Sequence, residues 1–113
     1  MGPASEIVRA PISEVTPVIE PPRNVPAGYE LSQNYPNPFN PTTNIEYRIA
    51  NAGLVTLKVY NVLGQRVTTL VNKVEQPGSY QMQFDGSNLA SGVYFYRLAA
   101  GSYLMTKKML LLK

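Results

Sequence analysis

The residues of this chain that could carry out chemistry are few, and no two of them form a catalytic pair. The sequence contains no Cys and no His, which removes the thiolate nucleophile, the commonest general base and the usual zinc ligands. After residue 29 the acids are Glu30, Glu46, Glu75 and Asp85, too widely spaced to suggest paired carboxylates. We therefore expect no enzymatic activity, no catalytic residue, no metal site and no cofactor.

Two polar segments contain residues that could form a site, but a structural role is favoured for both. Ser91 has neither a His partner nor a Lys three residues later to activate its hydroxyl. Residues 85–88, Asp-Gly-Ser-Asn, could offer oxygens to Ca²⁺, but a single carboxylate is a weak cation site and the composition is typical of a tight turn. The sequence predicts a turn at residues 85–88.

The basic residues near the C-terminus have two interpretations. Lys107, Lys108 and Lys113 alternate with Met and Leu, which is typical of an edge strand protected by charge from pairing with another sheet. The alternative to this favoured interpretation is a recognition patch for an acidic partner. The chain has ten Lys and Arg and seven acidic residues. Eight of the basic residues and four of the acidic ones follow residue 29, so the basic excess is mild. It falls short of a nucleic-acid footprint, and no apolar run is long enough to span a membrane.

The elements that must position these residues are strands. Apolar residues alternate with polar ones between turn signals, as in Ile45, Tyr47 and Ile49. Leu70 interrupts the alternation, which predicts a bulge or an exposed apolar side chain. In the last segment, residues 103–113, apolar residues occur in both alternating positions, so the sequence does not indicate which side of the strand faces inward. The expected strands cover residues 29–31, 42–49, 54–60, 65–71, 79–84, 93–98 and 103–113.

The strand count and spacing predict an all-β fold, an immunoglobulin-like antiparallel β-sandwich of about seven strands. Leu89 followed by Tyr94 suggests a tyrosine corner, in which a phenol bonds back to upstream backbone. Six of the ten prolines lie in residues 1–26, which predicts a Pro-rich extended linker before a domain at 27–113.

Aromatic residues of this domain have two expected roles. Tyr35 and Phe39 flank alternating Asn and Pro residues and should anchor this loop to the domain. We expect Tyr29, Tyr35, Tyr60 and Tyr103 to be exposed, and they could stack on sugars if several of them shared one flat face. The alternative function is therefore an accessory carbohydrate- or surface-binding module of a secreted enzyme.

Four motifs in order resemble one known family over about residues 28–113. Residues 29–43 run Tyr-Glu-Leu-Ser-Gln-Asn-Tyr-Pro-Asn-Pro-Phe-Asn-Pro-Thr-Thr, and residues 59–65 run Val-Tyr-Asn-Val-Leu-Gly-Gln. Residues 84–98 run Phe-Asp-Gly-Ser-Asn-Leu-Ala-Ser-Gly-Val-Tyr-Phe-Tyr-Arg-Leu, and residues 106–113 end the chain as Thr-Lys-Lys-Met-Leu-Leu-Leu-Lys. Together they resemble the C-terminal sorting domain, type A, of the type IX (Por) secretion system of Bacteroidetes-like bacteria.

The resemblance implies a non-catalytic signal that directs a fused upstream passenger through the periplasm and the outer-membrane translocon to the cell surface or medium. It implies that residues 1–26 tether the passenger, and that a sortase-like peptidase removes the domain in many members. Lys107, Lys108 and Lys113 are then the residues expected to contact the translocon. The motif positions expected to serve the fold are Asn37, Pro38, Gly64, Gly78, Leu89, Gly92 and Tyr94. The expected cleavage region comprises Pro21, Pro22, Arg23, Asn24, Val25, Pro26, Ala27 and Gly28.

Overall fold

The computed structural model describes residues 28–113, so the predicted linker and the cleavage region up to Ala27 lie outside the described residues. Within this range the chain forms seven strands and no helix. The strands are β3 (Glu30–Leu31), β4 (Thr42–Ile49), β5 (Gly53–Tyr60), β6 (Arg66–Glu75), β7 (Gly78–Asp85), β8 (Gly92–Ala100) and β9 (Tyr103–Leu111). The prediction of an all-β fold with about seven strands is confirmed.

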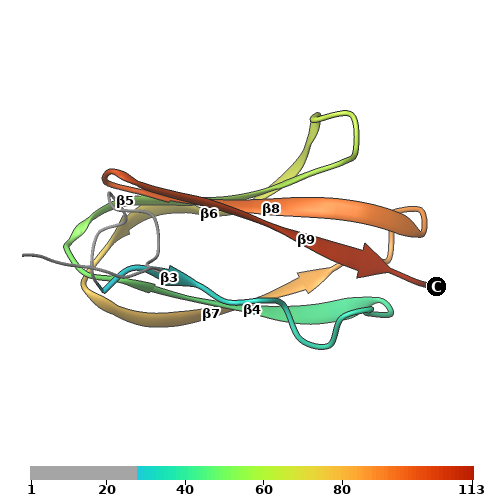
Figure 1. Cartoon of the computed structure of the whole chain (residues 1–113), viewed down its shortest axis with the longest axis horizontal. Coiled ribbons are helices and arrows are strands. Elements are labelled where there is room, and N and C mark those ends of the chain that lie inside the picture. Colours follow the sequence, from blue (N-terminus) through green and yellow to red (C-terminus); the bar gives the residue numbers. More distant parts are fainter. Residues whose placement is uncertain (1–27) are drawn as a thin grey trace, which may run out of the picture.

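The strands form two antiparallel sheets that face each other as the layers of a sandwich (Figure 1). One sheet has three strands in the order β3-β4-β7, and the other has four in the order β6-β5-β8-β9. The strand β9 lies at the edge of the four-stranded sheet and pairs with β8 along its whole length, from Gly92 opposite Leu111 to Ala100 opposite Tyr103.

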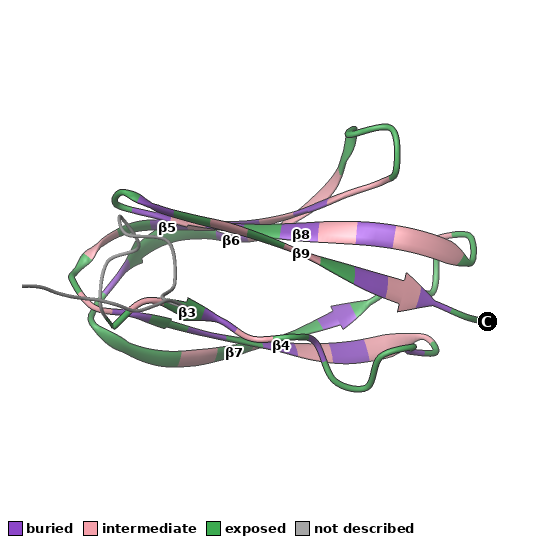
Figure 2. Cartoon of the chain, viewed as in Figure 1, coloured by how far each residue is buried: buried purple, intermediate pink, exposed green. Residues whose placement is uncertain are grey.

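The core lies between the two sheets, and buried residues alternate with more exposed ones along most of the long strands (Figure 2). Side chains of β4, β5, β8 and β9 supply most of it, and the most completely buried include Ile45, Leu57, Tyr96, Leu98 and Met109. The alternation predicted for Ile45, Tyr47 and Ile49 of β4 is confirmed, because all three are buried. On β7, Phe84 is buried, whereas Tyr80 and Met82 are half-buried.

The strand β6 contains the irregularity that its sequence indicated. Leu57 pairs with Val71 and Lys58 with Thr69, so Leu70 has no opposite residue and forms a bulge. A second shift occurs two residues further along β5, between Val59 and Tyr60. The strand also continues to Glu75, beyond the predicted end at residue 71, because the side chain of Glu75 turns into the sandwich and finds a partner there.

The last strand has one inward face, which decides the ambiguity in its sequence. Tyr103, Met109 and Leu111 are buried, while Leu104 and Leu112 remain largely exposed. The strand is therefore covered on its inner side by the opposite sheet, and it ends at Leu111 rather than at the last residue.

Candidate recognition surface

The three C-terminal lysines do not form one patch. Lys107 and Lys108 are neighbours on β9, so they point to opposite sides of the sheet, and only Lys108 lies on the outer side. Lys113 follows the end of the strand, where its Nζ donates to the Ser87 carbonyl oxygen at 2.5 Å. The structure thus separates residues that the sequence grouped by proximity.

The outer edge of β9 is covered by the loop of residues 32–41 over its C-terminal half. The Phe39 amide donates to the Leu110 carbonyl at 2.9 Å, and the Leu112 amide donates to the Phe39 carbonyl at 3.0 Å. The Asn37 Oδ1 accepts a hydrogen bond from the Leu110 amide at 3.0 Å. The backbone groups of the final strand are therefore held by a segment about seventy residues earlier, and Pro38 lies in the middle of that segment.

The same loop is anchored in the core by Phe39, which is 1% exposed and packs edge-on against Phe84 at 5.9 Å between ring centroids. The expectation that Phe39 anchors the loop is confirmed. The matching expectation for Tyr35 is wrong, because its side chain is 79% exposed. A backbone bridge from Tyr35 to Asn44 places this residue at the edge of β4, and its ring points away from the domain.

A buried polar cluster joins the loop to the middle of β8. The Tyr96 hydroxyl donates to the Ser32 carbonyl at 2.7 Å and accepts from the Asn34 amide at 2.8 Å. Asn34 also donates through Nδ2 to Thr43 Oγ1 at 3.0 Å. Burial raises the pKa of Tyr96 to about 12, because the phenolate would lose its water, and the hydrogen bond from Asn34 offsets only part of that cost.

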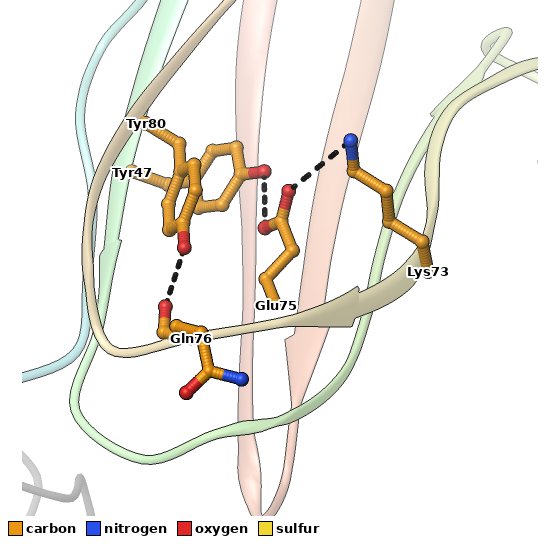
Figure 3. A network of polar contacts seen from close by, with 5 residues as sticks. All are labelled: Tyr47, Lys73, Glu75, Gln76 and Tyr80. Atoms are coloured by element: carbon orange, nitrogen blue, oxygen red, sulfur yellow. Dashed lines mark hydrogen bonds and ion pairs between the residues drawn. The ribbon is translucent and has the colours of Figure 1, made fainter.

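A second buried network connects the two sheets at the far end of β6 (Figure 3). Tyr47 of β4 donates its hydroxyl hydrogen to Glu75 Oε1 at 2.7 Å, and Lys73 Nζ lies 3.9 Å from the other carboxylate oxygen. Burial, followed by the neighbouring Glu75 carboxylate, raises the pKa of Tyr47. Tyr80 stacks on Tyr47 and donates to the Gln76 carbonyl, so each polar group of this network has a structural partner.

The turns use the remaining polar candidates. Asp85 Oδ1 accepts from both the amide and the hydroxyl of Ser87, and the side-chain hydrogen bond chiefly lowers the pKa of Asp85. This is the predicted turn, and no group of three or more potential ligands gathers anywhere in residues 28–113. Ser91 Oγ accepts from the Lys113 amide at 2.9 Å.

The other motif positions lie at the ends of strands. The Tyr94 hydroxyl donates to the Ala90 carbonyl at 2.7 Å, the geometry expected of a tyrosine corner, and Leu89 packs half-buried against the core. Gly64 closes the β5–β6 turn with a φ of 80°, which favours glycine over residues with a Cβ. Gly78 and Gly92 begin β7 and β8.

The four tyrosines considered for sugar binding do not share an exposed face. Tyr103 is 4% exposed, contrary to expectation, and Tyr29 stacks on it at 5.4 Å between ring centroids. Tyr60 is half-buried beneath the Arg97 guanidinium, which lies 5.1 Å from its ring centroid. Only Tyr35 among the four is exposed, so the structure offers no stacking platform built from them.

The fold and these contacts first define a class: a small β-sandwich module whose polar clusters, within the described range, serve its own loops, turns and sheet edges. Comparison with known families then supplies the assignment. A family described as a secretion system C-terminal sorting domain matches residues 33–112, which is most of the chain. The chain belongs to this family and carries a C-terminal signal for type IX secretion. No curated protein matches the sequence.

Membership of this family has consequences for location and partners. It implies interaction with the type IX secretion machinery, a fused upstream passenger and export to the cell surface or the extracellular space. Within the described part of the chain, no helix has the length and hydropathy needed to cross a membrane.

Proposed function

We propose that this domain is the non-catalytic address of a secreted protein, recognised by the outer-membrane translocon as a folded sandwich after passage through the periplasm. The observation that carries the proposal is the family match over residues 33–112, which covers β4 to β9, six of the seven strands. Supporting it, Ser91, Asp85 and Glu75 are engaged in turns and in a buried network.

The final strand and its basic residues are proposed to contact the translocon, and the three lysines are not expected to contribute equally to that contact. Lys108 is exposed on the outer side of β9, whereas Lys107 lies on the inner side and Lys113 donates to Ser87. Truncating the chain before these lysines would also remove Met109 and Leu111, which are fully buried. Substitution is therefore the cleaner test, because the sandwich keeps its core.

The test of the proposed function is a fusion of the full 113-residue chain behind a reporter that carries its own periplasmic signal, expressed in a host with this pathway. We expect reporter at the cell surface or in the medium. The same fusion in a strain without the translocon should keep the reporter in the periplasm. Periplasmic retention in the competent host would overturn the proposal.

Removal of the domain is proposed to occur between residues 21 and 28. Supporting this, Gly28 is exposed, and its carbonyl accepts only a long hydrogen bond from Arg48 Nε, at 3.3 Å. A cut before this point would leave all seven strands and both buried networks intact. N-terminal analysis of the released fragment should show a new terminus within residues 21–28. A terminus inside β3 or β4, or export with the domain still attached, would contradict cleavage there.

A further inference from the structure

The register of the four-stranded sheet aligns residues from four strands on its outer side. One row across the sheet is Arg66, Tyr60, Phe95 and Lys108, and the next is Thr69, Lys58, Arg97 and Thr106. These residues all occupy the outward phase, because their neighbours Val59, Tyr96 and Leu98 are buried. We call the six residues Lys58, Tyr60, Arg66, Phe95, Arg97 and Lys108 the outer basic face.

Acidic side chains of the described residues lie elsewhere. Glu30 and Glu46 belong to the other sheet, where Glu30 pairs with Arg48 at 3.2 Å. Glu75 is buried between the sheets, and Asp85 is engaged in its turn. Four of the eight cations in residues 28–113 therefore share one sheet face without a neighbouring carboxylate from the same range, so the modest net charge of +3 becomes a concentrated positive field.

The fold makes little use of these cations. Arg97 Nε donates to Thr106 Oγ1 at 3.1 Å, and its guanidinium covers the Tyr60 ring. Arg66 reaches only Thr69 Oγ1, at 3.4 Å. Arg97 is thus held in place by its own face, with guanidinium donors left to bind a partner, and such preorganisation lowers the entropic cost of binding.

The same face is hollowed and has an apolar rim. A depression of about 300 Å³ is lined by Tyr60, Val62, Phe95 and Arg97, together with Asn61, Gly64 and Thr106. Beside it, the β5–β6 turn projects from the sandwich (Figure 1) and exposes Val62 and Leu63, at 66% and 78%. The Asn61 side chain fixes this turn by accepting from the amides of Leu63 and Gln65.

We propose that the outer basic face, rather than the three C-terminal lysines together, is the surface that docks on an acidic protein of the secretion machinery. The inference rests on the proposed function and deepens it. The partner should present carboxylates to Arg97, Lys108 and Lys58, and an apolar side chain to the depression beside Tyr60 and Phe95.

A protein partner fits this chemistry better than a lipid or a polyphosphate. Tyr, Phe and Arg around a depression are the composition of a protein–protein contact centre. Charge on both sides sets specificity and speeds encounter. A membrane surface typically binds a cluster of about four to eight Lys and Arg, and because Lys107 and Lys113 lie off this face only the lowest of these numbers is present.

The experiment compares two variants that change the net charge equally, from +3 to +1. In the first, Arg97→Gln and Lys108→Gln neutralise two cations of the outer basic face. In the control, Ser79→Glu and Gln83→Glu add two acids to exposed positions on the outer side of β7. We expect the first variant of the reporter fusion to lose export by at least about tenfold, which corresponds to roughly 1.4 kcal/mol of binding free energy. We expect the control to be exported like the original chain, with unchanged thermal unfolding of both.

Three outcomes decide between explanations. Export of the original chain with no difference between the variants would overturn the docking surface while leaving the proposed function intact. If both variants are exported normally and Lys107→Glu abolishes export, recognition lies on the inner side of β9 and the proposal is overturned. Sedimentation of the purified chain with vesicles of anionic lipid, lost in the Arg97→Gln, Lys108→Gln variant, would identify a membrane partner and overturn the protein partner.

A photocrosslinking residue in place of Tyr60 gives an independent readout. Irradiation during export should produce a covalent adduct to a protein whose crosslinked segment is rich in Asp and Glu. The same residue in place of Gln83 should give no adduct. Crosslinking from Gln83 but not from Tyr60 would contradict the proposal.

Discussion

The two faces of the four-stranded sheet both carry aromatic residues, but the surroundings of their polar groups differ. On the inner face, Tyr94 and Tyr96 are buried, and each hydroxyl bonds to a backbone carbonyl of a loop or turn. On the outer face, Tyr60 and Phe95 are half-buried among cations. Aromatic content alone therefore does not mark a functional surface; the inner rings hold loops in place, and the outer ones remain available.

The difference also separates stability from recognition. Inner substitutions should lower the free energy of unfolding, because they open cavities or leave buried polar groups without partners. Outer substitutions should leave stability nearly unchanged and act on export. Four measurements on the full chain test this separation, beginning with the largest expected effect.

The first measurement concerns Phe39, the anchor of the loop that covers β9. Phe39→Ala should lower the free energy of unfolding by about 3–5 kcal/mol, because a fully buried ring that contacts Phe84 is removed. That is a large share of a typical margin of ~5–15 kcal/mol. Tyr35→Ala, in the same loop but 79% exposed, is the matched control and should change stability little. Equal losses from the two substitutions would contradict the anchoring role of Phe39.

The second measurement removes one hydroxyl from the inner face. Tyr96→Phe should cost about 1–3 kcal/mol, because the Asn34 amide and the Ser32 carbonyl lose their buried partner. Denaturant unfolding measures this loss. Tyr60→Phe, on the outer face, is the control and should be close to neutral. A Tyr96→Phe variant as stable as the original chain would mean that water replaces the hydroxyl.

The third measurement uses pH. The pKa of Tyr96 is raised from 10.0 to about 12, and burial raises those of Tyr47 and Tyr103 as well. Below pH 10 the phenols are protonated in both states, so their contribution to stability is fully present. As the pH rises beyond 10 the unfolded chain loses these protons first, and stability falls through the folded pKa. Tyr96→Phe should make the alkaline loss shallower; an unchanged slope would show that Tyr96 does not contribute to it.

The smallest effect is expected from the outer basic face. Arg97→Gln and Lys108→Gln should each change the free energy of unfolding by no more than about 0.5 kcal/mol, because neither cation pairs with a carboxylate within residues 28–113. The contacts of Arg97 with the Tyr60 ring and with Thr106 Oγ1 lie at the surface of the sheet and contribute little against this. A loss of several kcal/mol would show that this face serves the fold, and the contrast between the two faces would fail.

Sequence reasoning located the strands well and single loop residues poorly. The strand Thr42–Ile49 was predicted at its observed bounds, and the bulge at Leu70 was anticipated from broken alternation. Tyr35 and Tyr103 were each assigned to the wrong environment. Their burial depends on which distant segment covers them, and neither residue type nor spacing contains that information.

The candidate site shows the same limit. The outward phases of Lys58 and Arg97 were readable from alternation, but the lysines of the last segment were grouped because they are close in sequence. The structure instead places Lys108 in one row with Phe95 and Tyr60, and Lys107 on the opposite side. The sequence lacked the register between neighbouring strands, which decides which outward side chains lie next to each other.

The sequence by itself determined the fold class, the strands, most of their inward faces and the family. It could do so because successive side chains of a strand point to opposite sides, so local alternation records burial. Only the tertiary structure decided which outward residues become neighbours, that residues 32–41 cover the edge of β9, and which face collects the cations. These outcomes depend on pairing between segments far apart in the chain, and that pairing is set by the closure of the whole sandwich.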